Sequence, residues 1–214
     1  MDINISLLSK TNIKSGKLTS LIPEFYELKN VVENNDWHHK ENVFDHTLSV
    51  LDNLEKTLRN LNKATEQFLN KKIDGSARKN LLKVATLFHD IAKKETIVDN
   101  NSLTHCPDHE AKGAIKTKTI LKRFKLSNKE LEFISSIVKN HSIIDKILSV
   151  NNQNFQKEFV SFKKDFHNIY PELILLSFAD TAGSYSAKTR PAEFKYRISF
   201  YKKEIKNLLS KSKI

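Results

Sequence analysis

The chain of 214 residues has the length of one domain, and it contains only four glycines and four prolines. Leu, Lys, Asn, Ile and Glu are frequent, a composition that favours long helices with short turns and argues against a β-sandwich or a Rossmann sheet. The single cysteine, Cys106, excludes an internal disulfide framework and fits a reducing cytoplasm.

The first half of the chain predicts three helices after a weakly structured stretch over residues 1–20. A proline in the first helical position opens a helix over about 23–33. Apolar residues then recur at three- and four-residue steps and predict one long helix over 43–70. A glycine and Ser76 break the chain, and Ser76 is expected to cap a third helix over 77–93.

The second half predicts further helices. Residues 95–107 lack periodicity and are expected to form a loop. Ser127 and Glu130 have the spacing of a capping box, which predicts that a helix begins there and ends near His141. Other helices are expected over 108–123, 154–168 and 171–182, and from Pro191 onward. With no alternating strand pattern, we predict an all-α fold, a single bundle of about seven or eight helices.

The net charge of +11 is concentrated near the C-terminus. Lysine-rich faces commonly serve solubility, whereas the functional interpretation is attraction of a nucleotide or RNA. Aromatic residues interleave with the charges there, although their spacing also suits the buried side of a last helix. This candidate nucleic-acid contact comprises Lys188, Arg190, Lys195, Arg197, Lys202, Lys203, Lys206, Lys211 and Lys213, with only Glu193 and Glu204 among them.

The chain start lacks the basic and apolar regions of a signal peptide. No stretch approaches the ~20 apolar residues that a membrane span needs. We therefore expect a soluble, cytoplasmic protein that makes no membrane contact.

Two adjacent metal-ligand side chains, His89 and Asp90, lie in an otherwise apolar helical run. Such groups are costly in apolar surroundings unless something neutralises them, and a divalent cation does so while supplying hydroxide near neutral pH. His46 lies in an apolar stripe, and Asp180 ends the most apolar run of the chain. Each alone fits a hydrogen-bonded core histidine or a helix-capping acid. Together they predict one ion held from separate helices, and a mixed His/Asp set suits borderline divalent ions.

Three more residues are assigned to the same region. His109 opens a helix, where backbone N–H groups favour an anion, and His141 ends one, where a cation complements the helix dipole. Either histidine is expected to bind a second metal or to act on the substrate, for example as a proton donor. Lys93 lies one turn beyond His89 and is expected to offset the charge of a phosphate, with a solvated helix-end lysine as the alternative.

The remaining histidines are interpreted as less central. The Trp-His-His run at 37–39 is expected at the rim of the pocket. His105 beside Cys106 is a weak thiolate signal and is taken as a loop feature. His167 is expected at the surface.

These residues together resemble the HD superfamily of metal-dependent phosphohydrolases, whose ligand order is H…HD…D. The segments 37–48, 87–93, 105–114, 126–130 and 138–141 are similar to the HD domain attached to bacterial tRNA nucleotidyltransferases and poly(A) polymerases. The resemblance covers roughly residues 37–190 and implies an all-helical HD fold with metal ligands at His46, His89, Asp90 and Asp180. His109 and His141 match the extra histidines that dinuclear members use.

The resemblance also sets the expected domain division. Residues 1–36 are an N-terminal extension with a first helix, 37–190 are the HD domain, and 191–214 are a basic C-terminal helix packed on the same domain. Only 36 residues precede Trp37 and no Asp-x-Asp pair occurs, so polymerisation is not expected. Lys93 stands where HD proteins resembling nucleoside 5′-phosphatases or alarmone hydrolases have Glu, and the Gly-Tyr-Pro signature of cyclic-dinucleotide phosphodiesterases is absent.

The expected function is hydrolysis of a phosphomonoester or phosphodiester on a nucleotide or an RNA end by metal-activated water. The cofactor is one or two divalent ions (Mn, Ni, Co, Fe, Mg or Zn), and Lys93 and His109 are the expected catalytic residues. Two alternatives remain open at this point. One is a non-catalytic HD-fold module that binds RNA or protein, and the other is an HD-type nuclease, which would show a steep salt dependence.

Overall fold

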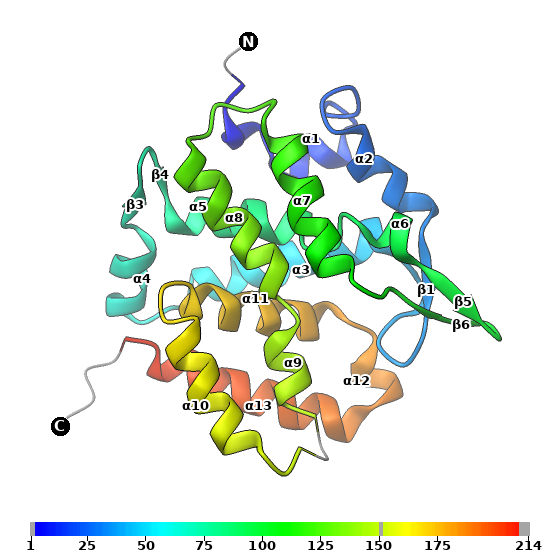
Figure 1. Cartoon of the computed structure of the whole chain (residues 1–214), viewed down its shortest axis with the longest axis vertical. Helices are drawn as coiled ribbons and strands as arrows, with labels where there is room; N and C mark the ends of the chain where they lie inside the picture. The colour runs from blue at the N-terminus through cyan, green and yellow to red at the C-terminus, as the bar shows by residue number, and fades with distance from the viewer. Residues whose placement is uncertain (1–2, 150–151, 210–214) are drawn as a thin grey trace.

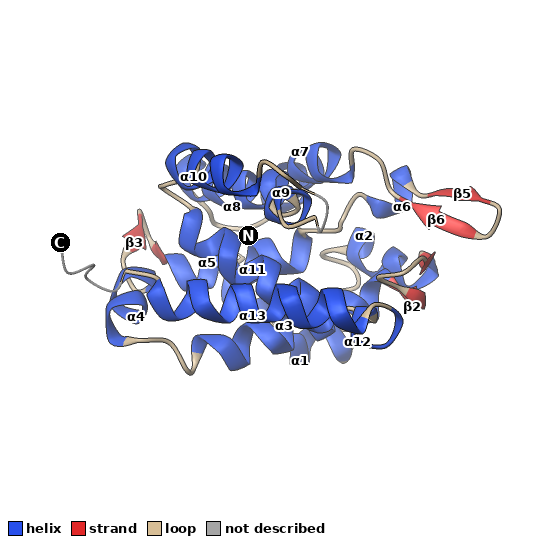
Figure 2. Ribbon diagram, turned by 90° about the horizontal axis from the view of Figure 1, so that it is seen from below, coloured by secondary structure: helices blue, strands red, loops and turns tan. Residues whose placement is uncertain are grey.

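The structure is a computed structural model that describes residues 3–149 and 152–209, and its central element is helix α11 (Tyr170–Gly183) (Figure 1). Residues 173–176 of α11 are fully buried. A helix that is apolar on nearly every side has to be covered on every side. Figure 2 shows α3 (Val43–Leu58) and α13 (Pro191–Asn207) toward one side of the molecule, with α7 (His109–Leu121), α8 (Asn128–Asn140) and α10 (Phe155–Asp165) toward the other.

Helix α3 begins where predicted but is shorter than predicted. The side chain of Asn42 caps it by accepting a hydrogen bond from the Asp45 backbone N–H at 2.8 Å. The helix ends at Leu58. A separate helix, α4 (Lys63–Leu69), begins after its own N-cap residue, Asn62. The expectation of one helix over 43–70 is therefore wrong, because a second capping residue within the periodic run starts a new helix.

Helix α5 (Arg78–Phe88) is shorter at both ends than the expected 77–93. Ser76 does not cap it, since Ser76 belongs to strand β4 and the capping position is Ala77, which makes no side-chain cap. At the other end the chain turns through residues 89–92 before the short helix α6 (Lys93–Thr96). His89 and Asp90 thus lie in a turn between two helices.

Helices α7 (His109–Leu121) and α8 (Asn128–Asn140) pack along each other, and α8 also packs on α5. The capping box of α8 is confirmed: Ser127 Oγ accepts from the Glu130 N–H at 3.2 Å, and the Glu130 carboxylate accepts from the Ser127 N–H at 2.8 Å. Helices α10 (Phe155–Asp165) and α13 lie close to their predicted ranges. Lys211 and Lys213 lie outside the described residues.

Residues 3–20 are more ordered than expected. They form a 3₁₀ turn η1 (Ile5–Leu7) and helix α1 (Lys10–Lys14), and Ile13 is fully buried in the common core. The predicted helix over 23–33 is a single turn, α2 (Pro23–Tyr26), followed by a 3₁₀ segment η2 (Glu27–Asn30). None of the helices in the described ranges is both long and apolar enough to cross a bilayer.

Three antiparallel hairpins interrupt the helices, and none was expected. Their strands have two to four residues, too few to show an alternating pattern. They pair β1 (Val32–Asn34) with β2 (His39–Asn42), β3 (Lys72–Ile73) with β4 (Ser76–Ala77), and β5 (Val98–Asn100) with β6 (Leu103–His105). Short helices α9 (Ile143–Ile147) and α12 (Ser186–Thr189) were also not foreseen. The fold is nonetheless helical, as predicted.

One close contact sets the spacing of α3 and α11. A Cβ atom at Gly183 would lie 3.1 Å from Val50 Cγ2 and 3.2 Å from the Val50 backbone nitrogen, closer than ordinary packing allows. Gly183 follows Asp180 by three residues and Val50 follows His46 by four, so this contact lies about one helical turn from both side chains. The glycine therefore lets the two helices approach where His46 and Asp180 face each other.

Candidate metal centre

Four predicted residues, from three parts of the chain, meet in the interior. His46 Nε2 lies 2.9 Å from Asp180 Oδ1 and 3.8 Å from Asp90 Oδ2. His89 Nε2 lies 3.2 Å from Asp90 Oδ2 and 3.9 Å from Asp180 Oδ1. His46, His89 and Asp90 are at most 2% exposed. The joint geometry that the sequence could only suggest is thus present in the structure.

The turn after α5 explains how two adjacent residues face the same point. Side chains of neighbours on a helix diverge by about 100°. Here α5 ends at Phe88, and the chain turns through residues 89–92, with the Lys93 N–H donating to the Asp90 carbonyl at 3.0 Å. The His89 imidazole and the Asp90 carboxylate consequently lie 3.2 Å apart.

The other oxygen of Asp90 faces a second pair of histidines. Asp90 Oδ1 lies 3.5 Å from His109 Nε2 and 3.8 Å from His141 Nε2. Ligand atoms of these three residues all lie within 4.8 Å of one another, as do those of His46, His89 and Asp180. The Asp90 carboxylate therefore stands between two groups, each able to surround a divalent ion.

Three of the histidines are oriented in the same way. In His89, His109 and His141, Nδ1 donates to a backbone carbonyl three residues earlier, which leaves Nε2 as the free acceptor. The acceptors are the carbonyls of Thr86, Cys106 and Val138, each at 2.7 Å. Fixing Nδ1–H on a carbonyl is the usual way in which proteins aim Nε2 at a metal.

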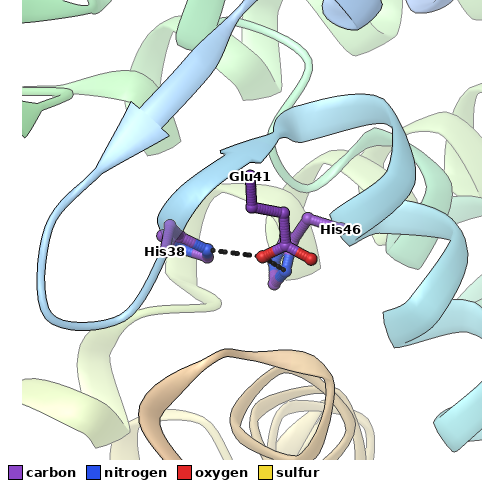
Figure 3. A group of neighbouring side chains, drawn as sticks. All are labelled: His38, Glu41 and His46. Carbon is purple, nitrogen blue, oxygen red and sulfur yellow. Dashed lines mark hydrogen bonds and ion pairs between the residues drawn. The ribbon is translucent and has the colours of Figure 1, made fainter. Parts of the chain in front are cut away.

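His46 is oriented by a carboxylate instead, as Figure 3 shows. Glu41 Oε2 lies 3.5 Å from His46 Nδ1 and 3.2 Å from His38 Nδ1. Burial would raise the pKa of Glu41, but its bonds to the two histidines outweigh burial and lower the pKa to about 2. A charged Glu41 thus holds the far side of the His46 ring while Nε2 faces Asp180.

The polar atoms at the centre fit a bound cation. His89 Nε2 is buried and makes no hydrogen bond in the described part of the chain, whereas Asp90 Oδ2 is paired with Lys93. Leaving a buried polar atom without a hydrogen bond costs about 1–3 kcal/mol. Burial and the neighbouring His89 and His109 lower the pKa of His141 to about 4, so its Nε2 lone pair is available at neutral pH. Nitrogen and oxygen donors together suit borderline divalent ions.

Lys93 is buried beside this centre. Its Nζ lies 2.6 Å from Glu33 Oε2 and 2.9 Å from Asp90 Oδ2. Burial opposes its charge, but Asp90 and Glu33 raise the pKa of Lys93 above its usual value. The interpretation of Lys93 as a solvated helix-end lysine is therefore wrong.

Glu33 and Glu41 were not foreseen as site residues. They lie on the hairpin β1–β2, for which the sequence showed no strand pattern, so nothing placed their carboxylates near His46 or Lys93. The pairing of β1 and β2, strands of three and four residues, brings these two carboxylates to the site.

A cavity of about 220 Å³ opens onto the two groups. It is lined by Asp90, Lys93, His109, His141 and Asp180, together with residues such as Trp37 and Asp145. Four lining residues are shared with a wider outer cavity of about 580 Å³, so the two are continuous: Trp37, His109, Ser142 and Asp145. The centre is thus buried but accessible from one side.

The residues expected at the rim divide between two places. Trp37 and His38 line the inner cavity, as expected, whereas His39 stacks on Tyr185 with ring centroids 5.2 Å apart. Cys106 points its sulfur at Glu33 Oε1, 3.7 Å away. His167 is exposed, as predicted.

The HD domain family matches residues 43–182, about two thirds of the chain and within the predicted range 37–190. HD domains are generally metal-dependent hydrolases of the phosphohydrolase superfamily, and the family implies divalent metal binding. The helical fold and the His/Asp groups described above agree with that match. The chain therefore belongs to the HD domain family.

Proposed function

We propose that this protein hydrolyses a phosphomonoester or phosphodiester on a nucleotide or an RNA end, using water activated by divalent metal. The observation that carries the proposal is the meeting of buried imidazole nitrogens and carboxylate oxygens at the end of an accessible cavity. The likeness to the HD domain attached to tRNA nucleotidyltransferases supports a nucleotide or an RNA end as the substrate. The single cysteine fits a cytoplasmic setting.

Two sets of residues would hold the ions. His46, His89, Asp90 and Asp180 form the first set, and Asp90, His109 and His141 form the second. When bound, the metal supplies Lewis-acid stabilisation of a phosphoryl oxygen and lowers the pKa of a bound water to about 7.

The chain's own residues supply orientation and charge. Glu41 and three backbone carbonyls fix the ring directions of the histidines. Lys93 lines the cavity, where Glu33 and Asp90 hold its ammonium group, and its remaining N–H would donate to a substrate phosphate. If only the first set is filled, a His109 ring protonated on both nitrogens would give its Nε2 proton to the leaving oxygen.

Nucleic-acid contact is proposed for the lysines of α13 only. Arg190 is paired with Asp36 and Glu193, and Arg197 is paired with Asp145 and Glu193, so neither has free charge for a phosphate backbone. Within the described ranges, no ion pair is formed by Lys195, Lys202, Lys203 or Lys206. We expect the protein to bind an RNA hairpin with an affinity that falls as the salt concentration rises. The Lys202→Ala variant should bind the hairpin more weakly still.

The main experiment compares metal-depleted protein with protein reloaded with Mn, Ni, Co, Fe, Mg or Zn. We expect release of phosphate or nucleotide from a panel of nucleoside monophosphates and dinucleotides in at least one reloaded sample, and none in the depleted sample. Circular dichroism of the depleted protein separates this from a structural metal, whose removal would reduce the helix content. Turnover that does not depend on metal, or a panel with no turnover at all, would contradict the proposal.

A further inference from the structure

Asp145 of α9 lines the cavity, and one of its two carboxyl oxygens is held by hydrogen bonds. Its Oδ1 accepts a hydrogen bond from the Tyr201 hydroxyl at 2.6 Å and another from Arg197 Nη1 at 3.0 Å. Arg197 is itself held by Glu193, and its guanidinium lies 4.7 Å from the Trp37 ring centre. Oδ2 makes no hydrogen bond to a described residue, and the side chain is 26% exposed and lines both cavities.

The other side chains around the cavity are poor sources of a proton once the second set of ligands is filled. His109 and His141 give their Nδ1 hydrogens to backbone carbonyls, and their Nε2 atoms face Asp90. Lys93 is locked between two carboxylates and stays charged. Asp145 is the remaining acidic side chain that lines the inner cavity and is not among the candidate metal ligands.

We propose that Asp145 is the general acid, which delivers a proton from Oδ2 to the oxygen that leaves phosphorus. This inference rests on the proposed function. The attacking water forms a new P–O bond, and the bond to the leaving oxygen breaks with its electron pair on that oxygen. The leaving oxygen takes the Asp145 proton and departs as an alcohol. The water's two hydrogens remain with the phosphate, and the Asp145 carboxylate regains a proton from the product phosphate or from solvent.

The surroundings of Asp145 suit this role. Burial raises its pKa and the charge of Asp180 on α11 adds to the effect, while Arg197 and Tyr201 on α13 oppose it, with a net pKa of about 7. A general acid works best when its pKa lies near the working pH. The two donors on Oδ1 also hold the carboxyl group in place and leave Oδ2 without a hydrogen bond to a described residue.

The test uses two esters that differ in their need for a proton. Adenosine 5′-monophosphate releases a strongly basic alkoxide, whereas 4-nitrophenyl phosphate releases a weakly basic phenolate; a dinucleotide and bis(4-nitrophenyl) phosphate replace them for a diesterase. In the metal-loaded protein, Asp145→Asn should slow the nucleotide ester by about a hundredfold or more, as general acids contribute, and barely change the nitrophenyl ester. The bound metal content, measured by elemental analysis, should equal that of the wild type.

Glu193→Gln is the matched control, because Glu193 contacts the same guanidinium but does not line the inner cavity. It should keep the wild-type ratio of the two rates. If Asp145→Asn fails to fold, Tyr201→Phe, which removes one donor from Oδ1, should slow the nucleotide ester more than the nitrophenyl ester. Equal losses on both esters in the variants would overturn the role of Asp145, whereas a wild type inactive on every ester would overturn the proposed function itself.

Discussion

The two ends of α5 both bury charged side chains, but they treat them differently. At the N-terminal end, Arg78 donates to both oxygens of Glu172, at 2.7 and 3.0 Å, and also to the Asn168 carbonyl. At the C-terminal end, His89 Nε2 is buried with no hydrogen bond in the described residues, and Asp90 pairs with Lys93 through Oδ2 while Oδ1 faces His109 and His141. The first end is a completed ion pair that serves stability, and the second is a set of donors that a cation would complete.

The largest effect is expected from Asp90, because its Oδ2 lies near His46 and His89 and its Oδ1 lies near His109 and His141. Asp90→Asn should lower the turnover of the metal-loaded protein by more than about a hundredfold, since even residues that only orient metal ligands contribute 10–100-fold. The bound metal should fall in the same variant, as elemental analysis would show. A variant that keeps its full metal content and turnover would mean that the C-terminal end of α5 is structural, like the other end.

The ion pair at the N-terminal end should affect stability alone. Arg78→Ala leaves Glu172, whose side chain has no exposed surface, buried without its partner, and should lower the free energy of unfolding by about 3–5 kcal/mol. Chemical denaturation measures this loss. Lys118→Ala is the control, because its partner Glu132 is 70% exposed, and it should cost less than about 1 kcal/mol. If the folded Arg78→Ala protein bound metal more weakly, the two ends would be coupled.

A smaller effect is expected from Glu41, which orients His46 without facing Asp180. Glu41→Gln should weaken metal binding about 10–100-fold, the usual range for a carboxylate behind a histidine ligand. Isothermal titration of the metal-depleted protein measures the change. Glu27→Gln, which removes a surface carboxylate paired with Lys94, should leave the affinity as it is. An unchanged affinity in Glu41→Gln would show that the backbone turn alone positions the donors.

The smallest effect is expected on the reactivity of Cys106, which lines the outer cavity next to the candidate metal groups. Burial and then the nearby Glu33 carboxylate raise the pKa of the thiol to about 12. The thiolate is the reactive form, so alkylation by iodoacetamide should be slow at pH 8 and should keep rising as the pH increases above 9. A small-molecule thiol measured alongside should level off near its own, lower pKa. Levelling of Cys106 at that same pH would contradict the burial described here.

The sequence predicted residues that form repeating patterns or complete a motif. The capping box at Ser127 and Glu130 depends on two side chains and one backbone turn, and it is confirmed. The sequence also shows that four metal-ligand residues lie in apolar runs, and the structure brings them together: His46, His89, Asp90 and Asp180. Their role as ligands stays a prediction, as do the roles of His109, His141 and Lys93 and the division at residues 36 and 190.

What the sequence did not predict depends on contacts between distant segments. Glu33 meets Lys93 because a short hairpin folds beside the turn after α5, and no periodicity marks strands of three residues. Arg197 looked like part of a basic surface but is 4% exposed, is paired with Glu193 and donates a hydrogen bond to Asp145. A charge count along the chain cannot tell a paired arginine from a solvated lysine.

The absence of a side chain at Gly183 affects the candidate metal ligands His46 and Asp180, which lie about one helical turn away. Gly183 of α11 lies directly against Val50 of α3. This contact fixes the separation of the two helices and therefore the distance between His46 and Asp180. Even a methyl group at position 183 would push α11 away from α3. The distance between His46 and Asp180, which a bound ion would have to span, would then increase. Selection for catalysis would then act on a residue that touches neither metal nor substrate, so the tolerance of position 183 to alanine is a measure of how finely the ligand spacing has to be kept.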